Sequence, residues 1–234
     1  MKIMSFNTQH CCGYLNDRID FELMADVIRD SGADIIGLNE MRGEGEIEGY
    51  TDQVSTLSAL TEIENYYFAK AIDVGGKNAP YGNGLLSKYP IESAETIMIP
   101  DPTERMPGGK WYETRCVLKA KLSCGITVLV THFGLNPDEQ ENAVKTVVEN
   151  LEGEKCVLMG DFNVEPNNPV LAPIRERLVD AATAFEGERL SFPSDAPRRK
   201  IDYIFVTPDI HLVSADIPAV VASDHRPHVA EIEG

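Results

Sequence analysis

Polar residues that suit phosphate-ester chemistry stand at the ends of apolar runs in this chain. They are an Asn, a Glu, an Asp-x-Asn pair and an Asp-His pair, at Asn7, Glu40, Asp161, Asn163, Asp224 and His225. Strand ends allow a sheet to hold several polar groups in fixed geometry. Carboxylate and amide oxygens are hard ligands suited to Mg²⁺ or Mn²⁺, and His adds proton handling or a charge. The set predicts metal-assisted cleavage of a phosphate ester.

The segment Gly160-Asp161-Phe162-Asn163 is the sharpest of these motifs. On an extended chain, residues i and i+2 share one face, so Asp161 and Asn163 could converge on one cation or water. Gly160 before them permits a close approach or an unusual backbone angle.

Asp202 lies inside an apolar run, Ile201-Asp202-Tyr203-Ile204-Phe205. A buried carboxylate without a partner is energetically costly, so the pattern requires one. His225 is the natural candidate. Arg42 stands two residues after Glu40 and would point the same way if that segment stays extended, which would place a phosphate-binding cation beside a metal-binding anion.

Several of these residues have ordinary structural explanations when taken singly. Asn7 suits a turn, Glu40 a solvated loop, and His132 a structural position at the end of a β-branched run. In Tyr81-Gly82-Asn83-Gly84, the Asn-Gly pair is above all a hairpin signal. The functional interpretation therefore depends on the combination.

Charge and composition narrow the class of protein. The 234 residues carry a formal net charge of −17, which repels polyanions at long range and disfavours duplex DNA as substrate. Acidic surfaces also simply keep proteins soluble, and local basic clusters such as residues 198–200 leave DNA open as an alternative. The chain has no apolar run of about 18 residues and no signal-peptide pattern. Its five cysteines form no zinc spacing, so we expect a reducing cytoplasm and no disulfide framework.

Apolar periodicity predicts the elements that position these residues. Helices are expected over 20–31, 51–64, 137–151 and 168–177, and strands over 2–6, 34–39, 66–72, 84–87, 91–99, 115–122, 126–131, 156–159, 201–206 and 227–232. A hairpin turn is expected at 123–125. The pattern predicts an α/β fold with two mainly antiparallel sheets packed together, helices outside, and one domain over 1–234. Three loops, 42–50, 100–114 and 182–200, are long enough to suggest function. Trp111 and Tyr112 in the second loop either stack on a substrate or cover the core.

The joint order of these motifs resembles the endonuclease/exonuclease/phosphatase (DNase I-like) superfamily, which includes DNase I, exonuclease III, neutral sphingomyelinases and inositol polyphosphate 5-phosphatases. The resemblance spans Asn7 to His225, nearly the whole chain. It implies a four-layer α/β/β/α sandwich, with the site at one rim of the two sheets.

By position, the resemblance implies that Glu40 is the main Mg²⁺ ligand, with Asn7 beside it and Asp224 near the metal. Asp161 and Asn163 would orient or deprotonate the attacking water and hold the phosphate.

The same resemblance implies that His225 contacts the phosphate oxygens, oriented by Asp202, and that His132 is a second histidine of the site. Further residues would contact the substrate or match positions that are often polar in the family: Arg42, Tyr81, Asn83, Arg115 and Ser191.

One position departs from the family pattern. Several nuclease members carry an Asp two residues after the early Asn, whereas this chain has Gln9. A second carboxylate ligand is therefore missing, which favours a single metal ion held through Glu40.

We expect a Mg²⁺- or Mn²⁺-dependent hydrolase acting on a phosphodiester or phosphomonoester of a small molecule or lipid headgroup. A DNA-directed endo- or exonuclease is the second hypothesis, disfavoured by the net charge. A noncatalytic binding protein that keeps the fold is the third, and the joint presence of the site residues speaks against it. We expect a monomer without a transmembrane segment.

Overall fold

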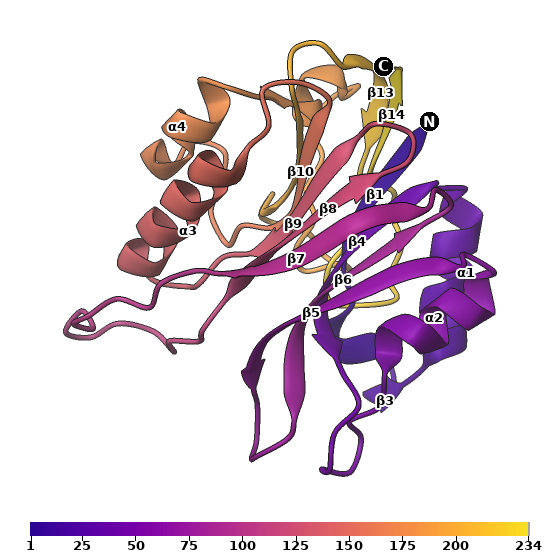
Figure 1. Ribbon diagram of the computed structural model, residues 1–234, viewed down its shortest axis with the longest axis vertical. Helices are drawn as coiled ribbons and strands as arrows, with labels where there is room; N and C mark the ends of the chain where they lie inside the picture. Colours follow the sequence, from indigo (N-terminus) through magenta and orange to yellow (C-terminus); the bar gives the residue numbers. More distant parts are fainter. Residues whose placement is uncertain (234) are drawn as a thin grey trace.

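Two six-stranded sheets pack face to face, with helices on their outer sides (Figure 1), in a computed structural model that describes residues 1–233. The first sheet has the order β13 (His211–Asp216), β14 (His228–Glu233), β1 (Lys2–Asn7), β4 (Ile35–Arg42), β6 (Pro80–Ser87), β5 (Asn65–Asp73). The second has the order β11 (Val179–Asp180), β12 (Asp202–Val206), β10 (Cys156–Asp161), β9 (Thr127–His132), β8 (Cys116–Leu122), β7 (Ile91–Met98). The expected four-layer sandwich is confirmed.

Strand pairing is mainly antiparallel, as expected, with one parallel pair in each sheet. β1 runs parallel to β4, and β9 runs parallel to β10. A short two-stranded ribbon, β2 (Cys12–Gly13) with β3 (Arg18–Ile19), follows the 3-10 turn η1 (Gln9–Cys11). Parallel strands end at the same rim of a sheet, so each sheet brings two chain segments together there.

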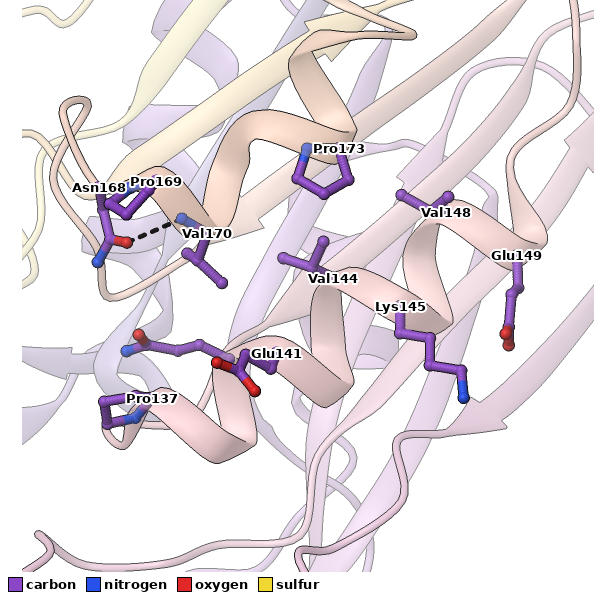
Figure 2. A pocket seen from close by; sticks show the side chains of 11 residues that line it. Pro137, Glu141, Val144, Lys145, Val148, Glu149, Asn168, Pro169, Val170 and Pro173 are labelled. Atoms are coloured by element: carbon purple, nitrogen blue, oxygen red, sulfur yellow. Dashed lines mark hydrogen bonds between the residues drawn. The ribbon is translucent and has the colours of Figure 1, made fainter.

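Helices α1 (Phe21–Ser31) and α2 (Gln53–Thr61) cover the outer face of the first sheet, while α3 (Pro137–Asn150) and α4 (Ala172–Arg175) lie outside the second (Figure 1). Asp20 caps α1 by accepting from the backbone N–H of Leu23 at 3.0 Å, and Gly32 ends the helix in the left-handed conformation. Side chains of α3 face the chain segment that leads into α4 (Figure 2).

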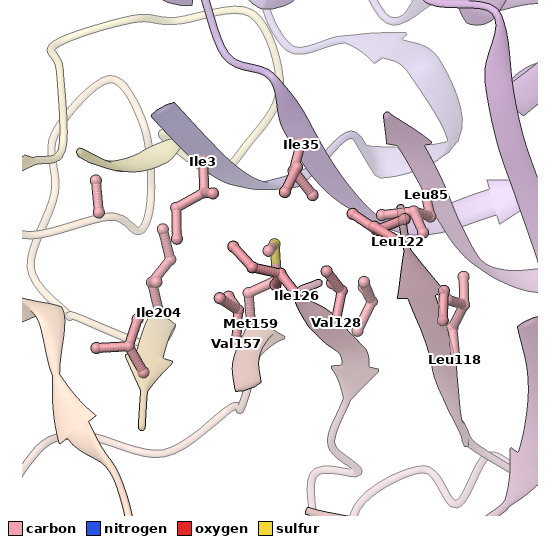
Figure 3. Packing of buried hydrophobic residues seen from close by; sticks show 14 of the residues in the cluster. Ile3, Ile35, Leu85, Leu118, Leu122, Ile126, Val128, Val157, Met159 and Ile204 are labelled. Carbon is pink, nitrogen blue, oxygen red and sulfur yellow. The ribbon is translucent and has the colours of Figure 1, made fainter. Parts of the chain in front are cut away.

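The core between the sheets is built from strand residues that alternate inward. Ile3, Ile35 and Leu85 of the first sheet face side chains of the second sheet such as Val128 and Met159, and all are fully buried (Figure 3). Because the side-chain period of a strand is two, the alternate residues face the outer helices. Both faces of each sheet are therefore buried where helices cover them, which explains the nearly continuous apolar runs in the sequence.

The structure corrects several expected elements. Strand β13 was not expected, because its sequence lacks a clear apolar alternation. The expected hairpin at 81–84 is wrong, since all four residues lie within β6. The expected helix over 168–177 is a 3-10 turn, η2 (Pro169–Leu171), followed by the single turn of α4, and another 3-10 turn, η3 (Ala181–Ala184), follows β11. The hairpin turn at 123–125 is confirmed between β8 and β9.

All five cysteines are free thiols, and four of them are buried. Within residues 1–233, none of the helices has the length and apolar character needed to cross a membrane.

Gly160 provides a test of the backbone at the end of β10. Its φ is +146°, and a Cβ added there would lie 1.8 Å from the carbonyl oxygen of Thr131. We expect Gly160→Ala to lower the free energy of unfolding by about 2–4 kcal/mol, because both the backbone angle and the close approach oppose a side chain. Urea unfolding followed by circular dichroism measures this. The matched control is Gly153→Ala, where an added Cβ meets nothing within 4 Å. A loss below about 0.5 kcal/mol in Gly160→Ala, similar to the control, would contradict this reading.

Candidate active site

One rim of the sandwich collects the polar residues at the strand ends. Asn7 and Glu40 lie at or near the ends of the parallel strands β1 and β4, and His132 and Asp161 end the parallel strands β9 and β10. The antiparallel strands β6 and β12 begin at the same rim, which adds one residue at or next to each strand's start to the set: Tyr81 and Asp202. Both sheets therefore contribute to one site.

The side-chain amide of Asn39 joins the two sheets directly beneath this site. It is fully buried, and its Nδ2 donates to the Asn83 Oδ1 at 2.8 Å and to the Thr131 carbonyl at 3.0 Å. Its Oδ1 accepts from the backbone N–H of Asp161 at 3.0 Å. One amide thereby connects β4 and β6 of the first sheet to β9 and β10 of the second. Sequence reasoning missed Asn39, although a buried Asn ending an apolar run needs partners.

Glu40 lies on a bulge rather than on a regular strand. Its φ is +63°, and the pairing of β4 with β6 shifts between Leu38 and Met41. The Glu40 carboxylate accepts from the Tyr81 hydroxyl at 2.9 Å and from Asn7 Nδ2 at 3.1 Å. The bulge turns the carboxylate toward the rim, where these two donors hold it.

Because of that bulge, the expectation that Arg42 shares a face with Glu40 through an extended backbone is wrong. The guanidinium of Arg42 lies over the ring of Tyr50, 4.8 Å from its centroid, and its Nη1 is 3.4 Å from the Gly49 carbonyl oxygen. Its role in binding substrate stays a prediction.

A turn, and not strand alternation, brings Asp161 and Asn163 together. The strand ends at Asp161, and Asn163 has a φ of +54°. The backbone N–H of Asn163 donates to Asp161 Oδ1 at 2.9 Å, which is an Asx turn. The convergence of the two side chains was expected, but its structural cause was not.

Asp161 Oδ2 is the point on which the site converges. It accepts from Asn7 Nδ2 at 3.1 Å and lies 3.4 Å from His132 Nε2 and 3.6 Å from His225 Nε2. Asn163 Nδ2 donates to the Phe133 carbonyl at 3.0 Å, beside the His132 ring. Two imidazoles from different segments thus face one carboxylate oxygen.

The predicted pairing of Asp202 with His225 is confirmed. His225 Nδ1 lies 2.8 Å from Asp202 Oδ2, and both side chains are buried. Ser191 Oγ accepts from the backbone N–H groups of Ile201 and Asp202 at 3.2 and 3.4 Å, so it anchors the start of β12. Ser194 Oγ donates to the Ser223 carbonyl at 2.6 Å and holds the segment that carries His225.

His132 has a different partner. Its Nδ1 is 3.0 Å from Arg115 Nη1, and Arg115 forms an ion pair with Glu113 at 2.8 Å. Since a guanidinium can only donate, Nδ1 of His132 accepts, which leaves the proton of the neutral ring on Nε2, 3.2 Å from Asn163 Nδ2 and 3.4 Å from Asp161 Oδ2. Glu113 was missed from the sequence, because it lies in a loop with no periodic pattern.

The two histidines are held in opposite proton states. Burial opposes the charged form of His225, but the carboxylates of Asp202 and Asp161 outweigh it and raise its pKa. Burial and the Arg115 cation lower the pKa of His132 well below its usual value. Burial, together with the neighbouring carboxylates, raises the pKa of Asp161. The site therefore contains a neutral imidazole, an imidazolium and a carboxylate of increased basicity.

Two further expected residues lie next to this centre. Asp224 is mostly buried, its Oδ1 accepts from Ser223 Oγ at 3.0 Å, and burial raises its pKa. Asn83 is buried beneath the rim, where its Nδ2 donates to the Cys116 carbonyl at 3.0 Å and its Oδ1 is bonded to Asn39. Both ends of this amide are bonded within the protein, so Asn83 supports Asn39, and its expected phosphate contact stays a prediction.

The chemistry of the rim fits a divalent cation. Glu40, Asp161, Asp202 and Asp224 place four carboxylates around a single imidazolium, and Glu40 contributes to raising the pKa of both Asp161 and Asp224. Ligand atoms of Asp161, Asp202 and His225 lie within 4.8 Å of one another. Because His225 Nδ1 and Asp202 Oδ2 are already paired, the carboxylates of Glu40 and Asp224 are the better candidates for holding a metal ion. Asn7 turns its Nδ2 toward Glu40 and Asp161, and its Oδ1 accepts from the backbone N–H of Gln9 at 3.1 Å, so its role as a metal ligand stays a prediction.

Comparisons with known proteins agree with this geometry. The family model described as "Endonuclease/Exonuclease/phosphatase family" matches residues 4–225. The Escherichia coli K12 protein YbhP, described as uncharacterized, is 27% identical over 256 residues, covering 99% of this chain and 95% of YbhP.

Solved structures share the fold. A mannosyl-6-phosphatase from Bacteroides thetaiotaomicron superposes with a TM-score of 0.80 at 16% identity, covering 100% of each chain. An endonuclease/exonuclease/phosphatase from Beutenbergia cavernae superposes with a TM-score of 0.79 at 23% identity, and the match covers 100% of this chain and 71% of that chain. A 3′ phosphatase from Neisseria, bound to a product DNA hairpin, gives 0.67 at 17% identity, covering 100% of both chains.

The opposite proton states of the two histidines can be observed directly. With EDTA present, we expect the imidazole nitrogens of His225 to remain doubly protonated at pH 8, because a raised pKa retains the proton above the usual 6.5. We expect His132 to remain neutral at pH 5.5, because a lowered pKa loses the proton below 6.5. Nitrogen-15 NMR of histidine-labelled protein measures both, and His225→Gln and His132→Gln assign the signals. Titration of both His132 and His225 near pH 6.5 would contradict the assignment.

Proposed function

The chain belongs to the endonuclease/exonuclease/phosphatase family, and on that premise we propose that it is a metal-dependent phosphoesterase. Its substrate is a phosphodiester or phosphomonoester of a small molecule or lipid headgroup. One observation carries the proposal: Asp161 Oδ2 faces two histidines that differ in charge, beside a carboxylate-rich rim. That arrangement provides a base, a cation and a metal-binding edge around one reacting phosphate.

Asp161 and Asn163 prepare the attacking water. Burial makes the Asp161 carboxylate a stronger base near neutral pH, and its Oδ2 is directed to the rim. Asn163 is fixed by the Phe133 carbonyl and positions the water beside it. The proton of the water passes to Asp161 Oδ2 as the water oxygen bonds to phosphorus. The P–O bond on the opposite side breaks, and the leaving oxygen departs with its electron pair and takes a proton from solvent.

His225 stabilises the negative charge that grows on the phosphoryl oxygens. It is held as an imidazolium by Asp202, so its charge and orientation are set before substrate arrives. Neutral His132 carries its proton on Nε2, 3.4 Å from Asp161 Oδ2, and Arg115 fixes this tautomer. Tyr81 and Arg42 contribute further phosphate contacts at the edge of the site.

Glu40, with Asn7 and Asp224, would hold Mg²⁺ or Mn²⁺ at the same rim. When bound, the ion supplies Lewis-acid polarisation of a phosphoryl oxygen and stabilises the leaving oxygen. Nδ2 of Asn7 donates to the carboxylates of both Glu40 and Asp161, so these two negative charges lie close enough together to need a cation or a donor between them.

The net charge of −17 favours a small substrate over duplex DNA. One protein with the same fold is named a mannosyl-6-phosphatase, which agrees with a phosphomonoester substrate. Another is a 3′ phosphatase bound to a product DNA hairpin, so a nucleic acid stays the second candidate. We propose that the chain acts as one domain and as a monomer in the cytoplasm.

The first experiment compares bis-p-nitrophenyl phosphate, p-nitrophenyl phosphate and supercoiled plasmid, each with Mg²⁺, with Mn²⁺ and with EDTA. We expect release of nitrophenol from the small esters only when metal is present, with little nicking of plasmid. Rapid nicking that EDTA abolishes and that weakens steeply with salt would assign a nuclease instead. The absence of metal-dependent turnover on all three would contradict the proposal.

Substitutions then test the roles of individual residues. We expect His225→Ala to lower kcat by about 10²–10⁴-fold, because the transition-state charge loses its fixed cation. We expect Glu40→Gln to raise the Mg²⁺ concentration needed for half-maximal rate by at least about tenfold, because it removes the main carboxylate. His211→Ala, on the exposed part of β13, is the matched control and keeps normal kinetics. Near-normal turnover of a folded His225→Ala protein would refute the role of that residue.

A further inference from the structure

An apolar groove runs along the outer side of α3. Its walls are Val144 and Val148 on the helix and Val170 and Pro173 on the facing segment, and its volume is about 690 Å³ (Figure 2). Three charged residues also line it: Glu141, Lys145 and Glu149. The proposed reaction uses none of these residues.

The groove adjoins a second cavity that reaches one residue of the catalytic centre. A second cavity of about 510 Å³ is lined by Asn163 of the catalytic centre, together with Lys110, Leu135 and Arg199. The two cavities share four lining residues: Pro137, Gln140, Asn168 and Pro169. A molecule that extends from Asn163 through the second cavity can therefore pass directly into the groove, because the two cavities meet at these shared residues.

The second cavity is polar, because Lys110, Arg199 and Glu165 are among the residues that line it. The backbone N–H of Lys110 donates to Asn136 Oδ1 at 2.6 Å, so the 100–114 loop is fastened to the start of α3 beside this cavity. Arg199 Nε pairs with Glu165 Oε1 at 3.1 Å, so one of the two cations of the lining is already paired with a carboxylate. This lining suits the polar part of a substrate better than a hydrocarbon chain.

The groove is long enough for an extended hydrocarbon chain. The α3 residues that line it extend from Pro137 to Glu149, which is about 18 Å at the α-helical rise.

We propose that the groove binds the apolar chain of the substrate, so that the phosphate ester cleaved at this site is an amphiphile. Its phosphate lies at Asp161 and His225, its polar part passes Lys110 and Arg199, and its hydrocarbon chain lies between α3 and the segment that contains Val170. This inference rests on the proposed phosphoesterase function and specifies its substrate class.

The test uses methyl, butyl, octyl and dodecyl phosphate with Mg²⁺, each below the concentration at which it aggregates. We expect KM to change little for the first carbons, which lie in the polar second cavity, and then to fall about twofold for each methylene that enters the groove, since a half-open groove removes about half of each methylene from water. Release of inorganic phosphate measures the rates.

Val148→Arg and Val170→Arg, each placing a charge in the groove, are expected to remove this dependence, so that KM for dodecyl phosphate approaches that for methyl phosphate. The matched control is Val213→Arg. Val213 is 46% exposed on β13 of the first sheet, whereas the groove lies outside the second sheet, so this variant keeps the dependence. Thermal unfolding verifies that each variant is folded, and either groove variant suffices.

The outcomes separate this inference from the function on which it rests. A KM that does not depend on chain length, with normal metal-dependent turnover, overturns the groove and leaves the phosphoesterase intact. Turnover of phospholipid in vesicles but not of monomeric dodecyl phosphate also overturns it, in favour of docking on a bilayer. If no ester is cleaved, calorimetric titration of dodecyl and methyl phosphate in EDTA decides. Binding of dodecyl phosphate alone, abolished by Val148→Arg, supports the groove, and equal or absent binding overturns it.

Discussion

The site depends on two buried amides, Asn39 and Asn83, that fasten the two sheets to each other. Sheets packed face to face are held mainly by apolar side chains, which fix their separation but leave some freedom to slide. Asn39 removes that freedom at the rim, because its hydrogen bonds to Asn83, Thr131 and Asp161 have directions as well as lengths. The distance from Glu40 on one sheet to Asp161 on the other is thereby set by the fold itself.

The same rim uses burial to separate the properties of chemically similar groups. His132 and His225 are both buried and approach the same oxygen of Asp161, yet one faces a guanidinium and the other a carboxylate. Their partners decide which keeps its proton, and each partner is itself fixed: Arg115 by Glu113, and Asp202 by the strand whose start Ser191 anchors. The charge distribution of the site is therefore a property of its supporting residues as much as of the residues that face the rim.

Much of the fold could be predicted from the sequence, since the periods of apolar residues mark most strands and the three long helices. The pairing of Asp202 with His225 was also predictable, because a carboxylate in an apolar strand needs a cation or donor. The bulge at Glu40 and the turn at Asn163 were not predictable, because a positive φ at a non-glycine residue leaves no pattern in the sequence. Asn39 was missed for a related reason: its partners lie on segments distant in the chain, and only the packed sheets bring them together. Glu113 was missed because its loop has no periodic pattern.

The two rims of the sandwich carry different parts of the chain: the site residues lie at one rim, and the ends of the described chain lie at the other. β1 runs toward the site and β14 runs away from it, so both ends of the described chain lie at the opposite rim, where the Met1 amine donates to the Ile232 carbonyl at 3.0 Å. The tight turn between β8 and β9 is at that rim as well. A fusion partner, a surface linker or an inserted segment placed there would leave the reactive rim facing outward. The far rim is therefore the suitable place to attach the protein to a support or to join it to another segment.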